Sequence, residues 1–254
     1  HHHTPSPPRS AARYTHSHHG TAPPTQGPAA GGHQEEPKPS IQLQTTHRTP
    51  AACRAEPSRG AKYVAKGYIA ELSLTLSMEV LERPLPKPSS EDYVSARLLE
   101  ALVEGRLAAE FLKRGLVRNA AGKAFQAWRA LLATLLGLEL ERLKALAKSE
   151  DERRWLETVA VPRLPTGRIK ALSQMLEEAG HVGITHSTNT ALNLHDYQHH
   201  GPDPDTALSK YRNREEAARD IALLLKELRE RAEALKQRIK WNKEMEEALN
   251  ALKH

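Results

Sequence analysis

The sequence has little cysteine and few aromatic residues. Cys53 is the only cysteine among 254 residues, and Phe, Trp and Tyr together make up 4% of the chain. A single thiol cannot form an intramolecular disulfide, and it cannot supply the paired thiolates of a cysteine-based zinc site. The aromatic residues are too few and too scattered to form a platform for stacked bases. We therefore expect core positions for Phe125, Trp128, Trp155 and Tyr197.

Long hydrophobic runs are also absent. No apolar segment approaches the roughly 18 residues that a membrane-spanning helix needs. The N-terminus does not show the charged and then apolar layout of a secretory signal. No cofactor motif is recognisable, and no cofactor is expected. These absences predict a soluble, cytoplasmic protein that does not contact a membrane.

The N-terminal part of the chain differs in composition from the rest. Residues 1–60 hold 10 of the 17 prolines and 8 of the 14 histidines, with almost no large aliphatic side chains. Such a segment buries too little apolar surface to offset the entropy lost on ordering it. The first methionine is Met78. We therefore expect residues 1–77 to be disordered and to be non-native or upstream sequence, and we place the folded domain at 78–254.

The positive charge of the chain is unevenly distributed. Residues 1–77 contain 8 basic and 4 acidic residues, whereas residues 78–254 contain 29 basic and 27 acidic residues. The domain itself is nearly neutral. The high isoelectric point is therefore no indication of nucleic-acid binding by the domain, although a local basic patch is compatible with these numbers.

Apolar residues at helical spacing, interrupted by proline and glycine, predict an all-α fold. The segment 119–136 is rich in alanine and leucine around most of its circumference, which is typical of the central helix of a bundle. A first helix is predicted from a Ser89–Asp92 capping box to Lys113. Further helices are predicted over 138–147, 149–157, 166–179 and 188–199.

A long last helix is predicted over 213–252. Asn213 with Glu216 three residues later is a helix-start pattern, and neither proline nor glycine follows. At about 1.5 Å per residue the helix would be roughly 58 Å long, more than a compact bundle covers. Its apolar seam is therefore a candidate interface with a second copy or a helical partner. The alternative is that it folds back along its own bundle. The seam consists of Ile221, Leu225, Leu228, Leu235 and Ile239.

Two histidines in the segment HDYQH are candidate metal ligands. His195 and His199 are four residues apart, as in the zinc-protease pattern HExxH, but Asp196 stands where the catalytic glutamate belongs. No third ligand is recognisable. We prefer the interpretation that they are ordinary polar residues, and a metal-dependent hydrolase is the weakest of our functional hypotheses.

Two Arg-Asn pairs stand at predicted helix starts, where backbone N–H groups and a guanidinium can hold a phosphate. Ordinary helix capping by residues with exposed charges is the simpler interpretation. Lys123 follows Gly122 without the spacing of a P-loop. The candidate anion or RNA contacts are Arg118, Asn119, Lys123, Tyr211, Arg212 and Asn213.

Three long blocks carry a family resemblance: MEVLERPLPKPSSEDYVSARLLEAL, RNAAGKAFQAWRALLATLL and TALNLHDYQHHGPDPDTALSKYRNREEAARDI. They resemble the PaREP1 family of paralogous proteins from hyperthermophilic archaea over residues 78–228. The resemblance implies a HEPN-like up-and-down helical bundle, similar also to C-terminal domains of nucleotidyltransferases, in which two protomers often pair. It carries no established activity.

HEPN ribonucleases have an arginine, a polar residue and then a histidine a few positions later. After Arg212 the corresponding positions hold Ala217, Ala218 and Arg219. After Arg118 they hold Lys123, Ala124 and Phe125. The signature therefore lacks its proton-transfer group.

Our leading hypothesis is therefore a non-enzymatic interaction module that dimerises or docks a nucleotidyltransferase-like partner. The main alternative is a HEPN-like RNA-binding protein or ribonuclease with a degenerate motif, whose dimer cleft contains Arg118, Lys123, Tyr211 and Arg212.

Overall fold

The computed structural model describes residues 79–253, and within that range it is helical and contains no strand. The predicted all-α class is confirmed. The expectations for residues 1–77, including disorder and a non-native origin, concern residues outside the described range. No helix of the described part is long and apolar enough to cross a membrane.

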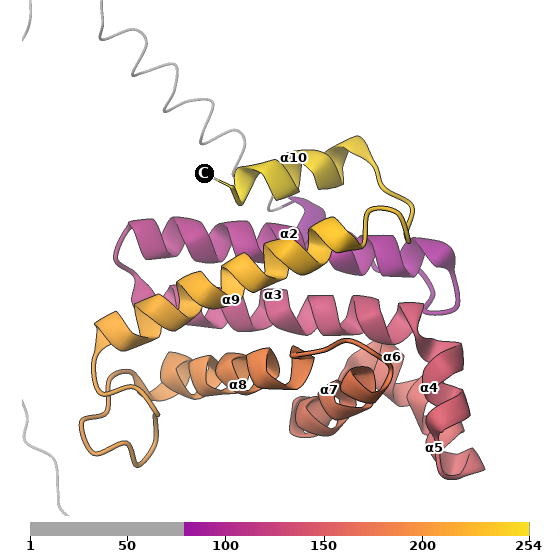
Figure 1. Cartoon of the computed structure of the whole chain (residues 1–254). Helices are drawn as coiled ribbons and strands as arrows, with labels where there is room; N and C mark the ends of the chain where they lie inside the picture. The colour runs from indigo at the N-terminus through magenta and orange to yellow at the C-terminus, as the bar shows by residue number, and fades with distance from the viewer. Residues whose placement is uncertain (1–78, 254) are drawn as a thin grey trace, which may run out of the picture. The chain divides into compact units, whose positions relative to one another are not determined.

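The central helix is α3 (Val117–Leu138), as the alanine- and leucine-rich segment predicts. Three helices pack around it: α2 (Glu91–Lys113), α8 (Ile184–His200) and α9 (Arg214–Ala234). In Figure 1, α2 runs above α3 and α8 below it, and α9 crosses obliquely in front of α3. Leu131 and Leu135 of α3 are buried, and so are Phe125, Trp128 and Tyr197. Trp155 is only partly buried.

The two central helices begin at slightly different residues from those predicted. The N-cap of α2 is Ser90, and its hydroxyl donates to the carbonyl of Lys87 at 2.8 Å, so the Ser89 capping box is wrong. Helix α3 begins two residues before Asn119, which therefore lies in its first turn. The turn between α2 and α3 contains Gly115 at φ 73°, where a glycine avoids the strain of a side chain.

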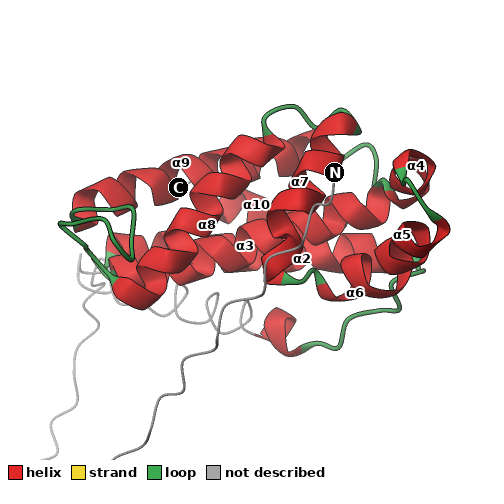
Figure 2. Ribbon diagram, turned by 90° about the horizontal axis from the view of Figure 1, so that it is seen from below, coloured by secondary structure: helices red, strands yellow, loops and turns green. Residues whose placement is uncertain are grey.

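Short helices cover the C-terminal end of α3. Both Figure 1 and Figure 2 show α4, α5 and α6 gathered at this end, opposite the loop between α8 and α9. Ser149 caps α5, accepting from the backbone N–H of Glu152 at 3.2 Å. In chain order the elements are α4 (Leu140–Leu146), α5 (Glu150–Trp155), a π-helical turn (Leu156–Ala160), α6 (Val161–Arg163), a 3-10 turn (Thr166–Arg168) and α7 (Ile169–Glu178).

The start of α9 is as predicted. The backbone N–H of Glu216 donates to the Asn213 side chain at 2.9 Å, and the Glu216 carboxylate accepts from the backbone N–H of Arg212 at 2.9 Å. The first bond satisfies a backbone donor that the helix leaves free, and the second ties the residue before the cap to the first turn.

The prediction of one uninterrupted helix over 213–252 is wrong. Helix α9 ends at Ala234, and a separate helix α10 (Lys243–Ala251) begins after Asn242, whose side chain accepts from the backbone N–H of Met245 at 2.8 Å. The intervening segment is held against the bundle by the Arg238–Glu139 ion pair, at 2.7 Å. Figure 1 shows α10 lying over α2, and Met245 and Leu249 are buried there.

The apolar seam therefore lies within the chain's own bundle. Ile221, Leu228 and Leu235 are buried, and Leu225 and Ile239 pack against the same core. This is the arrangement that our alternative interpretation of the segment described. These side chains are taken up by intramolecular packing, so the seam does not support a dimer interface.

Candidate nucleic-acid interface

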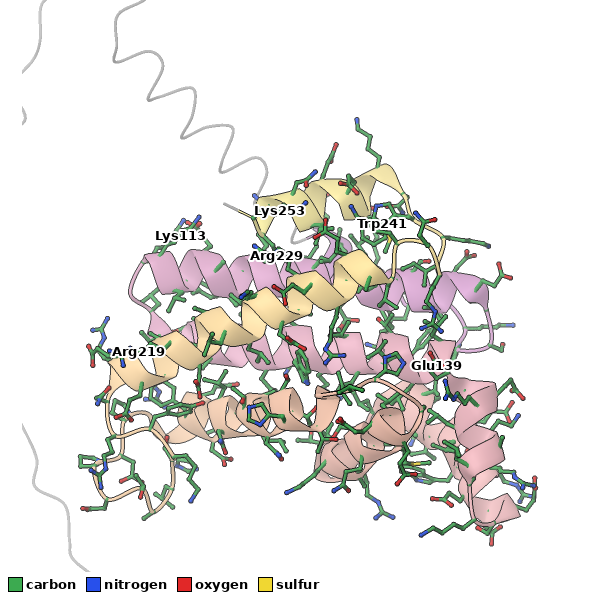
Figure 3. The ribbon with its side chains drawn as sticks, viewed as in Figure 1. Lys113, Glu139, Arg219, Arg229, Trp241 and Lys253 are labelled. Atoms are coloured by element: carbon green, nitrogen blue, oxygen red, sulfur yellow. The ribbon has the colours of Figure 1, made fainter. Side chains whose placement is uncertain are left out.

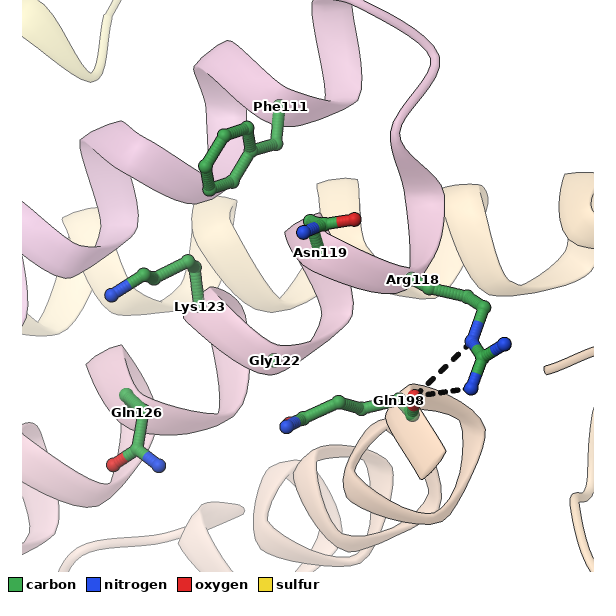
Figure 4. Close-up of a pocket in the computed structure, with 7 residues that line it drawn as sticks. All are labelled: Phe111, Arg118, Asn119, Gly122, Lys123, Gln126 and Gln198. Carbon is green, nitrogen blue, oxygen red and sulfur yellow. Dashed lines mark hydrogen bonds between the residues drawn. The ribbon is translucent and has the colours of Figure 1, made fainter. Parts of the chain in front are cut away.

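Three of the six candidate anion contacts line one hollow on the surface. Arg118, Asn119 and Lys123 project from the first turns of α3 into a hollow of about 660 Å³ between α2, α3 and α8 (Figure 4). The other lining residues are Phe111, Gly122, Gln126 and Gln198.

Arg118 joins α3 to the C-terminus of α8. Its Nη2 donates to the backbone carbonyls of Gln198 and His199 at 3.0 and 2.6 Å, and its Nε donates to the Gln198 carbonyl at 3.2 Å. These carbonyls have no partner within the helix, so a cation is well suited to this position. Because carbonyls are neutral, the guanidinium keeps its full charge at the edge of the hollow.

Gly122 allows the side chain of Gln198 to lie against α3. A Cβ at position 122 would stand 2.7 Å from Gln198 Oε1 and 2.8 Å from its Cδ, closer than real contacts allow. With glycine there, α3 and α8 approach each other and the Gln198 amide forms part of the wall (Figure 4).

A second, smaller hollow continues the first, and the two share Gln126. Arg129 lines one side of this hollow. It donates to the carbonyls of Arg163 and Leu164 at 3.1 and 3.3 Å and so holds the C-terminal end of α6. We call the two hollows together the α3 groove. The second hollow is lined by Arg97, Glu100, Gln126, Arg129, Ala130, Ala133, Arg163 and Leu164.

The α3 groove is more basic than the domain that carries it. Five basic side chains and one acidic side chain, Glu100, line it, and Glu104 pairs with Lys123 without lining the groove. Residues 79–253 as a whole have 29 basic and 27 acidic side chains. Five basic side chains less Glu100 and Glu104 give the groove a net charge of +3, against +2 for the whole described range, so the rest of the domain is close to neutral. The five are Arg97, Arg118, Lys123, Arg129 and Arg163.

Burial influences the titration of the groove residues. It lowers the pKa of Arg129, and the positive charge of Arg97 lowers it further. The Lys123 ammonium lies 2.9 Å from Glu104 Oε2, and burial raises the pKa of that carboxyl more than Lys123 lowers it.

The remaining candidates lie at the start of α9, outside the groove. Tyr211 is buried, its hydroxyl donates to Asp220 at 2.7 Å, and burial followed by that bond raises its pKa far above the ordinary range. Arg212 has an exposed side chain, and Asn213 is the α9 cap. Tyr211 therefore serves the core, and Asn213 serves the helix start.

The histidine pair packs against α3. The His195 ring stacks on Phe125 at 4.2 Å between centroids, and His199 meets it edge-on at 4.9 Å. Burial, and then the neighbouring His199, lowers the pKa of His195. Within the described range no group of three or more His, Cys, Asp or Glu side chains is placed to hold a metal ion. The structure thus supplies no third ligand to this pair.

Sequence reasoning missed much of the groove. It overlooked Phe111, Gln126 and Gln198, as well as the arginines at 97, 129 and 163. One signal was available, because Arg118, Gln126 and Arg129 recur at helical spacing, with Gly122 between them, on a largely apolar helix. The contributions of α2, α6 and α8 depend on packing and had no local signal.

The fold and the groove together define a helical bundle with a basic groove along one side of its central helix. The model of the archaeal PaREP1/PaREP8 family matches residues 96–222, and the chain belongs to this family. The matched range contains every residue of the α3 groove and ends within α9, before α10. No curated protein and no solved structure matches the chain.

Proposed function

We propose that the domain is a non-enzymatic RNA-binding module that holds single-stranded RNA in the α3 groove. The observation that carries this proposal is the excess of basic side chains along the groove in a domain that is otherwise nearly neutral. Lysine and arginine beside a phosphate backbone release condensed counterions, which is the main source of affinity for a nucleic acid.

The other groove residues favour RNA over a small anion. Asn119, Gln126 and Gln198 carry amides that both donate and accept hydrogen bonds, as base edges and the 2′-hydroxyl do. Phe111 lines the same hollow and offers an aromatic face for a base. Arg118 and Arg129 are three helical turns apart, or about 16 Å at 1.5 Å per residue, which spans several phosphates.

This proposal replaces partner docking through the last helix as our leading hypothesis, because the seam that suggested docking is buried within the bundle. The HEPN-like relationship and a homodimer are retained as proposals that follow from the family resemblance, and a cytoplasmic location is retained as a proposal from the sequence pattern. RNA binding in the α3 groove depends on none of them.

The first prediction tests the groove with a matched pair of arginine variants. Arg163 lines the groove and has an exposed side chain, whereas Arg219 is exposed on α9 (Figure 3) and does not line it. Fluorescence anisotropy of the full chain with a labelled RNA of about twelve nucleotides gives the affinity. We expect Arg163→Gln to weaken binding roughly fivefold at about 50 mM salt and to reduce the salt slope by about 1.

The Arg219→Gln variant makes the same change of charge and should leave the affinity within about twofold. This control matters because residues 1–77 also carry a net positive charge. Equal losses in the two variants would indicate general attraction to the chain, and the absence of RNA binding in the parent protein would refute the proposed function.

A further inference from the structure

A buried carboxylate lies beneath the basic side chains of the groove. Glu104 of α2 is only 8% exposed, and its two carboxylate oxygens lie 3.2 and 2.9 Å from the Lys123 ammonium of α3. The Lys123 side chain is about one third exposed and lines the groove. The same ammonium therefore faces both an internal anion and the space that a ligand would fill.

We propose that Glu104 is an internal competitor that lowers the affinity of the α3 groove for RNA by occupying Lys123. The inference rests on the proposed function and assigns a role to a residue that does not line the groove. A phosphate that enters the groove must either share Lys123 with Glu104 or draw it away, and in both cases the carboxylate opposes binding. Removing its charge should therefore strengthen binding.

The surroundings of Glu104 make Lys123 its principal counter-charge. The other charged group that acts on it is Glu100, one turn earlier on α2, and this carboxylate is repulsive. Within the described residues, Glu104 Oε2 accepts no hydrogen bond, so its ion pair with Lys123 is the compensation it has.

The arrangement makes RNA binding dependent on pH. Burial raises the pKa of Glu104, so this carboxyl takes up its proton at a higher pH than an exposed glutamate does. When pH falls through that raised pKa, Glu104 becomes neutral and no longer holds Lys123. Phosphodiesters stay ionised in this range, so the net positive charge available to RNA rises and binding tightens. At pH values well above the raised pKa, Glu104 stays ionised, and its contribution to the pH dependence of binding disappears.

The second prediction concerns Glu104→Gln, which keeps the shape of the side chain and removes its charge. We expect it to bind a uridine-only RNA, whose bases do not take up protons in acid, roughly fivefold more tightly than the parent at about pH 8. The parent should approach the affinity of the variant as pH falls toward about pH 5, and the rise that protonated histidines cause in both proteins cancels in the ratio of the two affinities. Adding Lys123→Met should abolish the gain, because the released ammonium is then missing.

Glu110→Gln is the matched control, since Glu110 is on the same helix but outside the groove, where it pairs with Arg114. It should change the affinity by less than about twofold. Circular dichroism checks that every variant is folded. If the parent binds RNA and Glu104→Gln binds no better than Glu110→Gln, this inference is overturned while the proposed function stands. If neither the parent nor any variant binds, the proposed function itself fails.

Discussion

Two glycines on the central helices show how the same missing side chain serves different purposes at the residue scale. A Cβ on Gly105 would stand 2.7 Å from Leu228 Cδ2, with Leu225 and Leu252 close behind, inside the core. A Cβ on Gly122 would meet the Gln198 amide, the flexible end of a side chain in the groove wall. The first glycine permits helix packing, and the second shapes a surface.

The third prediction compares alanine at these two glycines. Alanine stabilises a helix by about 1 kcal/mol relative to glycine, but overpacking a core costs about 1 to 3 kcal/mol. The two effects partly offset each other, so Gly105→Ala should lower the free energy of unfolding by up to about 2 kcal/mol. Gly122→Ala should be close to neutral in urea denaturation, and it should weaken RNA binding because the displaced Gln198 amide enters the groove. A larger loss of stability in Gly122→Ala would mean that Gln198 cannot move.

At the scale of elements, the sequence predicted the helix ends that are fixed by contacts between residues close together in the chain. Asn213 with Glu216, and Gly115 after α2, mark boundaries through contacts between residues a few positions apart. The break between α9 and α10 contains neither glycine nor proline. Arg238 donates a hydrogen bond to Glu139, and the Ser95 hydroxyl donates one to the Lys240 carbonyl. The partners are 99 and 145 residues apart in the sequence. Periodicity alone could not show these contacts.

Only the part of the groove that comes from residues close together in the sequence was predictable. Arg118, Asn119 and Lys123 were candidates because they stand together at the start of one helix. Arg97 and Arg163 join them only because α2 and α6 pack beside α3. The local basic patch was compatible with the charge count, but its position depended on this packing.

The fourth prediction compares the two asparagine caps of α9 and α10. Replacing an asparagine cap by alanine costs about 0.5 to 2 kcal/mol. Helix α9 packs against α2, α3 and α8, so Asn213→Ala should lower the global free energy of unfolding. Helix α10 packs mainly against α2, so Asn242→Ala should chiefly raise local amide exchange over 243–251. Hydrogen exchange read by mass spectrometry distinguishes them, and global protection lost in Asn242→Ala would show that α10 unfolds with the whole bundle.

At the scale of the whole molecule, the last forty residues complete the bundle. The core includes side chains from α2 through α10, with Leu235 at the point where α9 ends and the chain turns back. The earlier expectation of an exposed seam assumed a straight helix that leaves the bundle. Because the chain turns, the same leucines are buried within the bundle, and the polar α3 groove is a surface that stays open to a ligand.

The fifth prediction separates these two arrangements with a pair of leucines on the last helices. Leu235 is 4% exposed and Leu223 is 62% exposed. If the seam is internal, Leu235→Lys must bury an ammonium or disrupt the packing, and it should lose at least about 2 kcal/mol of stability. Leu223→Lys makes the same change on the surface and should stay within about 0.5 kcal/mol. The urea midpoints of both variants, read with sedimentation of the full chain, provide the measurement. A Leu235→Lys protein that keeps its stability but sediments as a smaller species than the parent would show that the seam joins two copies in solution.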